Sequence, residues 1–155
     1  MSNWPLLSVL IWLPILGGAL ILALGNARAD AARWLSLAVA VLTFVLSLGL
    51  LSGFDYANPG LQFVESHAWI PSFDIHYNLG ADGIAVALLL LNTLITVLTL
   101  AGAWGSVNKR VAQYYAAFLI LEGLTNGIFA SSDAVLFYVF FEAMLIPMFL
   151  IIGVW

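Results

Sequence analysis

The sequence predicts an all-α integral membrane protein, a bundle of about five transmembrane helices that forms a single membrane domain over residues 1–155. Of the 155 residues, 64% are hydrophobic and only 8% are charged, whereas a soluble domain carries roughly 25% charged residues. The mean hydropathy is +1.10. The apolar residues also gather in runs close to the roughly 20 residues that a helix needs to cross a bilayer.

Five such apolar runs follow one another along the chain. We expect membrane helices over about 4–24, 34–51, 84–104, 112–130 and 134–155, with a long outer loop over 53–83. The first run is not expected to be a cleaved signal peptide, because no basic residue precedes it and it exceeds the roughly 7–15 apolar residues of a signal sequence.

The four basic residues of the chain occupy only two of the connections between these runs. Arg28 and Arg33 lie between the first and second runs, and Lys109 and Arg110 lie between the third and fourth. Connections rich in Lys and Arg stay on the cytoplasmic side of a membrane. We therefore expect a multi-pass protein whose N-terminus and 53–83 loop lie outside.

The long outer loop contains a segment in which apolar and polar residues alternate. In "FDIHYNL", Phe73 to Leu79, every second residue is apolar, which is typical of a half-buried β-strand. This strand can pair with the 61–64 region as a β-hairpin on the membrane surface. His67 and His76 lie nearby without the tight spacing of metal ligands, so we expect no metal site there.

A single acidic residue interrupts the last apolar run, "FYVFFEAMLIPMF" from Phe137 to Phe149. Glu142 should lie roughly 12 Å below the outer surface at 1.5 Å per residue. A carboxylate is costly at that depth, so it should face protein or water and find a partner. Because an acid that gains and loses a proton inside the membrane suits a proton relay, we favour that role over a neutral packing residue.

Glu122 is a second acid, in the fourth run, at the same expected depth as Glu142, since each lies ten residues from Ser132 in the turn between them. If the two face each other, they would share protons as a coupled pair; otherwise Glu122 points elsewhere. Pro147 deprives the Ala143 carbonyl of its helical donor. The helix should then kink beside Glu142, unless the proline is merely tolerated.

Other polar and small residues have structural explanations. Asp82 opens the third run, where we favour a helix N-cap. Helix–helix contacts are expected of Asn92, Thr93, Thr96 and Thr99, and close helix approach of Gly17, Gly18 and Gly123. With no cysteine, the chain lacks disulfides, zinc–thiolate sites and iron–sulfur ligands. No nucleotide-binding loop, Ser/His/Asp arrangement or nucleic-acid surface is found.

Three segments point to a known family. The family is that of the M-type antiporter-like subunit of proton-pumping NADH:quinone oxidoreductase, respiratory complex I. Its fifth helix closely resembles "DAVLFYVFFEAMLIPMFLIIGVW", which "NGIFASS" precedes in this chain. Its third helix resembles "LGADGIAVALLLLN", and its first helix resembles "WLPILGGAL". The resemblance runs through nearly all of the chain. The spacing of Glu142, Pro147 and Met148 separates it from the related L- and N-type subunits and, less decisively, from a subunit of cation/proton antiporter complexes.

The resemblance implies a proton-translocating subunit with Glu142 as relay, in a bacterial inner membrane. The implied partners are L- and N-type subunits and the lipid bilayer. NADH, FMN, iron–sulfur clusters and quinone are implied for the parent complex, with no cofactor on this chain. A cation/proton antiporter subunit, or a truncated piece that serves only membrane assembly, is the alternative. The family also uses an intramembrane lysine. Because no run here contains Lys and the chain ends at Trp155, we expect the N-terminal part of a longer subunit.

Overall fold

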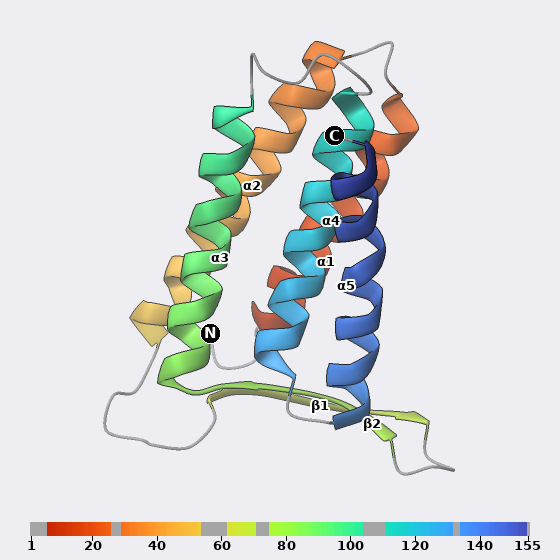
Figure 1. Ribbon diagram of the computed structural model, residues 1–155. Coiled ribbons are helices and arrows are strands. Elements are labelled where there is room, and N and C mark those ends of the chain that lie inside the picture. Colours follow the sequence, from red (N-terminus) through yellow and green to blue (C-terminus); the bar gives the residue numbers. More distant parts are fainter. Residues whose placement is uncertain are drawn as a thin grey trace.

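The computed structural model describes residues 6–25, 29–53, 62–70, 75–103, 111–131 and 134–154. Within these ranges, five helices stand side by side and alternate in direction (Figure 1). They are α1 (Leu6–Leu24), α2 (Ala29–Gly53), α3 (Gly83–Gly102), α4 (Val111–Ala130) and α5 (Ala134–Val154). Four of these, α1, α2, α3 and α5, are long and apolar enough to cross a membrane. The predicted helical membrane bundle is thereby confirmed.

Helix α4 is the central helix of the bundle. It has the same length as α3 but is more polar, since it carries Gln113, Glu122 and Asn126. It packs against each of the other four helices, and ten of its twenty residues are buried. Because its neighbours are mostly other helices rather than lipid, α4 needs less apolar surface to run through the same thickness as the others (Figure 1).

Helix α2 begins at Ala29, five residues before the predicted start at residue 34. The difference arises because the helix continues beyond the apolar run. Asp30 lies in the first turn, where a negative charge interacts favourably with the helix dipole. Its carboxylate accepts a hydrogen bond from Arg33 at 3.1 Å. Ion pairing three residues apart supports a helical turn, so hydropathy alone underestimates the helix.

The predicted hairpin is present and longer than expected. Strand β1 (Gln62–Ile70) pairs antiparallel with β2 (Ile75–Ala81), and Glu65 lies opposite Leu79 in the register. The hairpin lies across one end of the bundle (Figure 1). Leu79 and Ala81 are fully buried and belong to the same apolar cluster as Leu7. Strand β1 continues six residues past the predicted 61–64 region, and β2 ends two residues later than predicted, at Ala81, where it meets this core.

Asp82 connects the hairpin to the bundle. It follows β2 directly and is the N-cap of α3, where its carboxylate accepts a hydrogen bond from the Ala85 N–H at 2.9 Å. A side-chain acceptor at this position satisfies one of the free N–H groups of the first turn. The N-cap interpretation is therefore confirmed, and it accounts for the sharp change from strand to helix.

The helix core consists of two apolar clusters separated by a polar layer. One cluster, near the hairpin, includes Leu10 and Leu89, and the other, toward the opposite end, includes Leu100 and Leu119. Between them lies a set of buried polar side chains, which we call the polar layer: Ser47, Thr93, Thr96, Glu122 and Asn126. Buried polar groups are costly unless they are hydrogen-bonded, so their partners show what this layer does.

Small residues bring α1 and α4 into close contact. A Cβ atom on Gly18 of α1 would lie 2.7 Å from Ile120 and 2.9 Å from the Ala116 carbonyl oxygen. A Cβ on Gly123 of α4 would collide with the Ile11 backbone carbonyl. The expected role of these glycines in close helix approach is confirmed.

Candidate functional site

One hydrogen bond in the polar layer exists because a proline leaves a backbone carbonyl without its helical donor. Pro14 lies inside α1 and has no N–H group, so the carbonyl of Leu10, four residues earlier, lacks its helical donor. The Asn126 side chain on α4 donates to that carbonyl at 2.8 Å. Sequence analysis missed this pair. The available signal was a proline and an asparagine, each in the middle of an apolar run.

Asn92 on α3 extends the same network. Its amide group donates to the Asn126 side-chain oxygen at 2.8 Å and to the backbone carbonyl of Glu122 at 3.2 Å. On the other side of α3, the hydroxyls of Ser47 and Thr93 lie 3.0 Å apart. The predicted helix–helix contacts of Asn92 and Thr93 are therefore present, and the network fixes the backbone beside Glu122.

The carboxyl group of Glu122 is the exception in this layer. Glu122 is 1% exposed, and neither of its carboxyl oxygens has a hydrogen-bond partner among the described residues. Unpartnered buried polar groups are rare in native proteins, and each one needs an explanation. Glu122 also lines a cavity of about 270 Å³ that is bounded by side chains of α3, α4 and α5.

Glu142 is exposed on the described bundle; the sequence predicted that it would face protein or water and find a partner. The reason for the exposure is the position of α5, whose helix contacts are mainly with α4, so that α5 lies at the edge of the described bundle. Phe140 and Pro147 are on the buried face of α5. Successive helix residues are rotated by about 100°, so Glu142, two residues after Phe140, points away from the bundle.

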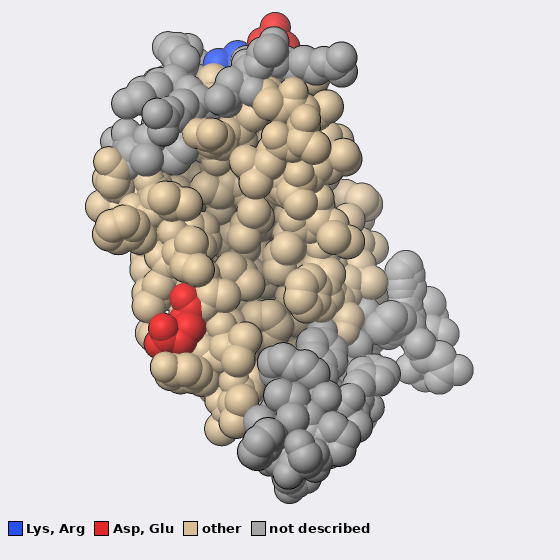
Figure 2. All heavy atoms as spheres, turned by 90° about the vertical axis from the view of Figure 1, so that its right-hand side faces the viewer, with Lys and Arg blue, Asp and Glu red and all other residues tan. Residues whose placement is uncertain are grey.

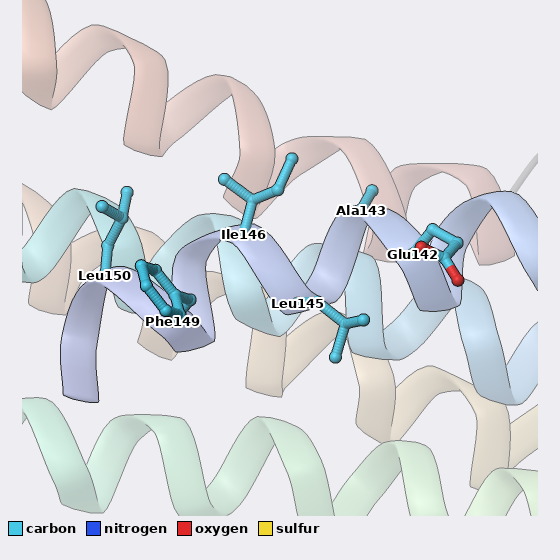
Figure 3. A pocket seen from close by; sticks show the side chains of 6 residues that line it. All are labelled: Glu142, Ala143, Leu145, Ile146, Phe149 and Leu150. Atoms are coloured by element: carbon cyan, nitrogen blue, oxygen red, sulfur yellow. The ribbon is translucent and has the colours of Figure 1, made fainter. Parts of the chain in front are cut away.

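Glu142 lies at one end of a groove on this outer face. The other lining residues come from α5 as well (Figure 3) and, with Glu142, form two rows in which the spacing is three or four residues: Glu142, Leu145 and Phe149, and Ala143, Ile146 and Leu150. On the side of the molecule on which α5 lies, the middle of the described surface is uncharged; an acidic patch lies in its lower half, and basic and acidic residues lie at its upper end (Figure 2). A carboxylate in such apolar surroundings is costly.

The structure does not bring the two acids together. Glu122 precedes Ala130 by eight positions and Glu142 follows Ala134 by eight positions, so the two lie at equal depth, as predicted. However, α5 turns Met144 and Met148 toward the Glu122 cavity, while Glu142 lines the outer groove. The Glu122 carboxyl group of α4 and the Glu142 carboxyl group therefore lie on different sides of α5.

Pro147 lies inside α5, which continues through it as one helix to Val154. Its missing N–H leaves the Ala143 carbonyl without the usual helical donor. Ala143 is next to Glu142 and lines the same groove. A carbonyl oxygen without its helical donor therefore belongs to the residue that follows Glu142 in the sequence.

Comparison with known proteins gives a consistent result. No protein-family model matches the chain. The chain is 49% identical over 154 residues to NADH-quinone oxidoreductase subunit M of Rhodobacter capsulatus, which covers 97% of this chain and 30% of that protein. It is 41% identical over 149 residues to NADH-ubiquinone oxidoreductase chain 4 of Arabidopsis thaliana, covering 96% of this chain and 30% of that one. The chain thus spans about a third of the length of these relatives.

A solved structure has the same fold. A chain of respiratory complex I from Thermus thermophilus with bound NADH superimposes with a TM-score of 0.72 and 30% sequence identity, over 91% of this chain and 27% of that chain. The same relationship is thus found in the sequence and in the helix arrangement. Over the part that it spans, this chain belongs to the family of NADH-quinone oxidoreductase subunit M and chain 4.

Proposed function

We propose that this chain is the N-terminal part of a proton-translocating membrane subunit of NADH:quinone oxidoreductase, and that Glu142 is its proton relay. The observation that carries the proposal is the 49% identity with a subunit M over 97% of the chain. The position of Glu142 supports the relay role, because an ionisable group within an apolar membrane helix is functional by default.

Glu142 can act by gaining and losing one proton. Uptake of a proton converts its carboxylate to a carboxylic acid, and release restores the charge. A cation beside the groove would favour the ionised form, and withdrawal of that cation would favour proton uptake. Glu142 and Ala143 line an open groove that is formed by α5 alone. The cation beside Glu142 would therefore come from a further segment of the subunit or from a neighbouring subunit.

The redox chemistry would take place on other subunits of the complex. NADH, FMN, iron–sulfur clusters and quinone would belong to other subunits of the parent complex, and we propose no cofactor site on this chain. Its proposed partners are the L- and N-type membrane subunits and the lipid bilayer. Quinone reduction would then drive proton transport through this subunit electrostatically.

Co-purification tests the assignment to a redox complex. A full-length subunit with an affinity tag, isolated in mild detergent from its native membrane, should carry flavin, iron–sulfur clusters and NADH:quinone activity. Tagging an unrelated membrane protein of the same host supplies the control. Membrane partners without flavin or iron–sulfur clusters would instead indicate the alternative, a cation/proton antiporter complex.

We also propose that the hairpin end of the bundle faces the periplasm of a bacterial inner membrane. The proposal rests on the basic residues. Of these, Arg28, Lys109 and Arg110 lie outside the described residues, whereas Arg33 lies in the first turns of α2, at the end of the bundle opposite the hairpin (Figure 1).

Cysteine labelling tests this orientation, because the chain has no native cysteine. Asn58→Cys lies between α2 and β1, and Asn108→Cys lies between α3 and α4. A membrane-impermeant maleimide added to intact cells should label the first variant, and the second should react only after the membrane is opened. Equal labelling of both variants in intact cells would contradict the orientation.

A further inference from the structure

We propose that the cavity between α3, α4 and α5 is an internal water site, through which Glu122 exchanges a proton with the end of the bundle opposite the hairpin. Glu122 would thus be a second proton site, separate from the groove of Glu142. The inference rests on the proposed function only for the use of this proton in transport. The exchange itself can be measured without it.

The cavity is large enough for water, and polar side chains of α3 and α4 interrupt a lining that is otherwise formed by apolar residues such as Phe118, Met144 and Met148. Its volume is about 270 Å³, and one water molecule occupies about 30 Å³ in the liquid. Besides Glu122, its polar lining consists of Asn92, Thr96, Thr99 and Thr125. A buried water requires two to four polar partners, so these five side chains can hold several molecules.

Three of the polar residues form a path along α3. Asn92, Thr96 and Thr99 are spaced four and three residues apart, so they lie on one face of the helix. They span roughly 10 Å at 1.5 Å per residue. Thr99 is three residues before Gly102, where α3 ends. The path therefore runs from the level of Glu122 to within one turn of the end opposite the hairpin.

The hydrogen bonds among the lining residues indicate which kind of molecule can bind in the cavity. The Thr96 hydroxyl donates to the Asn92 carbonyl at 2.9 Å, and the Thr125 hydroxyl donates to the Leu121 carbonyl at 2.7 Å. The Asn92 amide group donates to Asn126 and to the Glu122 backbone. These donors are therefore already used, and their oxygen atoms remain as acceptors. An occupant that supplies hydrogens, such as water, fits this lining.

Glu122 is the only ionisable side chain among the residues that line the cavity. In their described ranges, α1 and α3 carry no ionisable residue, and Asp30 and Arg33 of α2 lie at the far end of that helix. Glu142 faces the other side of α5. Any proton taken up from this cavity into the protein therefore has Glu122 as its acceptor.

The position of the carboxyl group suggests how the exchange proceeds. Its two oxygens are covered and unpartnered, a position that gives an ionised carboxylate no compensating donor. Rotation of the side chain would bring the carboxyl into the cavity. There the proton would bond to a water oxygen, and the electron pair of the broken O–H bond would stay on the carboxylate. Reprotonation would return the carboxyl to its covered position.

Infrared spectroscopy of the full chain in phospholipid bilayers tests this proposal. The spectrum of the chain minus that of Glu122→Gln should contain a carboxylic acid C=O band. On transfer to D₂O, the band should shift to the deuterated frequency while the helix amides remain unexchanged. In Thr96→Val/Thr99→Val, which keeps the side-chain shape but removes two water partners, this exchange should slow roughly tenfold.

Thr43→Val is the matched control, because Thr43 is also buried and donates to the carbonyl four residues earlier, at 2.8 Å, but does not line the cavity. Its exchange should match the parent. A missing C=O band, a band that exchanges only with the helix amides, or equal rates in the double variant would each overturn the proposal. Because no turnover is required, such a result would leave the role of Glu142 open to its own test.

Discussion

Glu142→Gln is expected to lower coupled NADH:quinone activity strongly, by roughly tenfold or more, when it is introduced into the full-length subunit in its complex. Glutamine keeps the size and polarity of the side chain but cannot release a proton. The groove on α5 contains one ionisable residue, Glu142, so no neighbour there can replace it. The rate of NADH oxidation by membrane vesicles with added quinone measures the effect.

Two further variants separate chemistry from packing. Glu142→Asp retains a carboxyl group one methylene shorter, and part of the activity should survive. Glu122→Gln should lower the NADH:quinone activity less than Glu142→Gln does. Glu122 lies at the same depth but on the other side of α5, outside the groove of Glu142. Full activity of Glu142→Gln, or equal loss in the aspartate variant, would show that the carboxyl group at this position does not relay protons.

Gly123→Ala is expected to destabilise the bundle, although it adds only one methyl group. The new Cβ would collide with the Ile11 backbone carbonyl and lie 2.5 Å from the Ile15 side chain. Because a backbone atom cannot move aside as a side-chain end can, α1 and α4 would have to separate. Overpacking of this kind costs about 1–3 kcal/mol, which should appear as a lower thermal unfolding temperature in detergent.

Gly102→Ala is the matched control. Gly102 is the last residue of α3, and a Cβ there would meet nothing within 4 Å. Alanine favours a helix over glycine by up to about 1 kcal/mol, so this variant should be as stable as the parent or slightly more stable. Equal unfolding temperatures for the two alanine variants would mean that α1 and α4 do not pack as closely as the structure shows.

Much of the fold could be predicted from the sequence because the signals were local. The apolar runs fixed the helices within a few residues, and alternation in Phe73–Leu79 indicated the hairpin. Asp82 was recognisable as an N-cap from its position before an apolar run. The helix start at Ala29 was missed because Asp30 and Arg33 reduce hydropathy while they stabilise a helical turn.

The directions of the acids could not be predicted, for a physical reason. Helix α5 is apolar on nearly every side, so its sequence has no periodic pattern to indicate which face meets α4. Depth follows from counting residues, and the equal depth of Glu122 and Glu142 was therefore predictable. Rotation about the helix axis depends on the packing of Phe140 on Gly127, where a Cβ would lie 2.8 Å from the ring, and on other tertiary contacts.

The number of protons moved per NADH oxidised, in sealed membrane vesicles that contain the complex, tests the role of Glu142 most directly. The ratio corrects for any difference in the amount of assembled complex. We predict that vesicles with Glu142→Gln show no NADH-driven proton translocation by the complex, and that Glu142→Asp vesicles retain part of it. A parental ratio in Glu142→Gln vesicles would contradict the proposal that this carboxyl group is the proton relay.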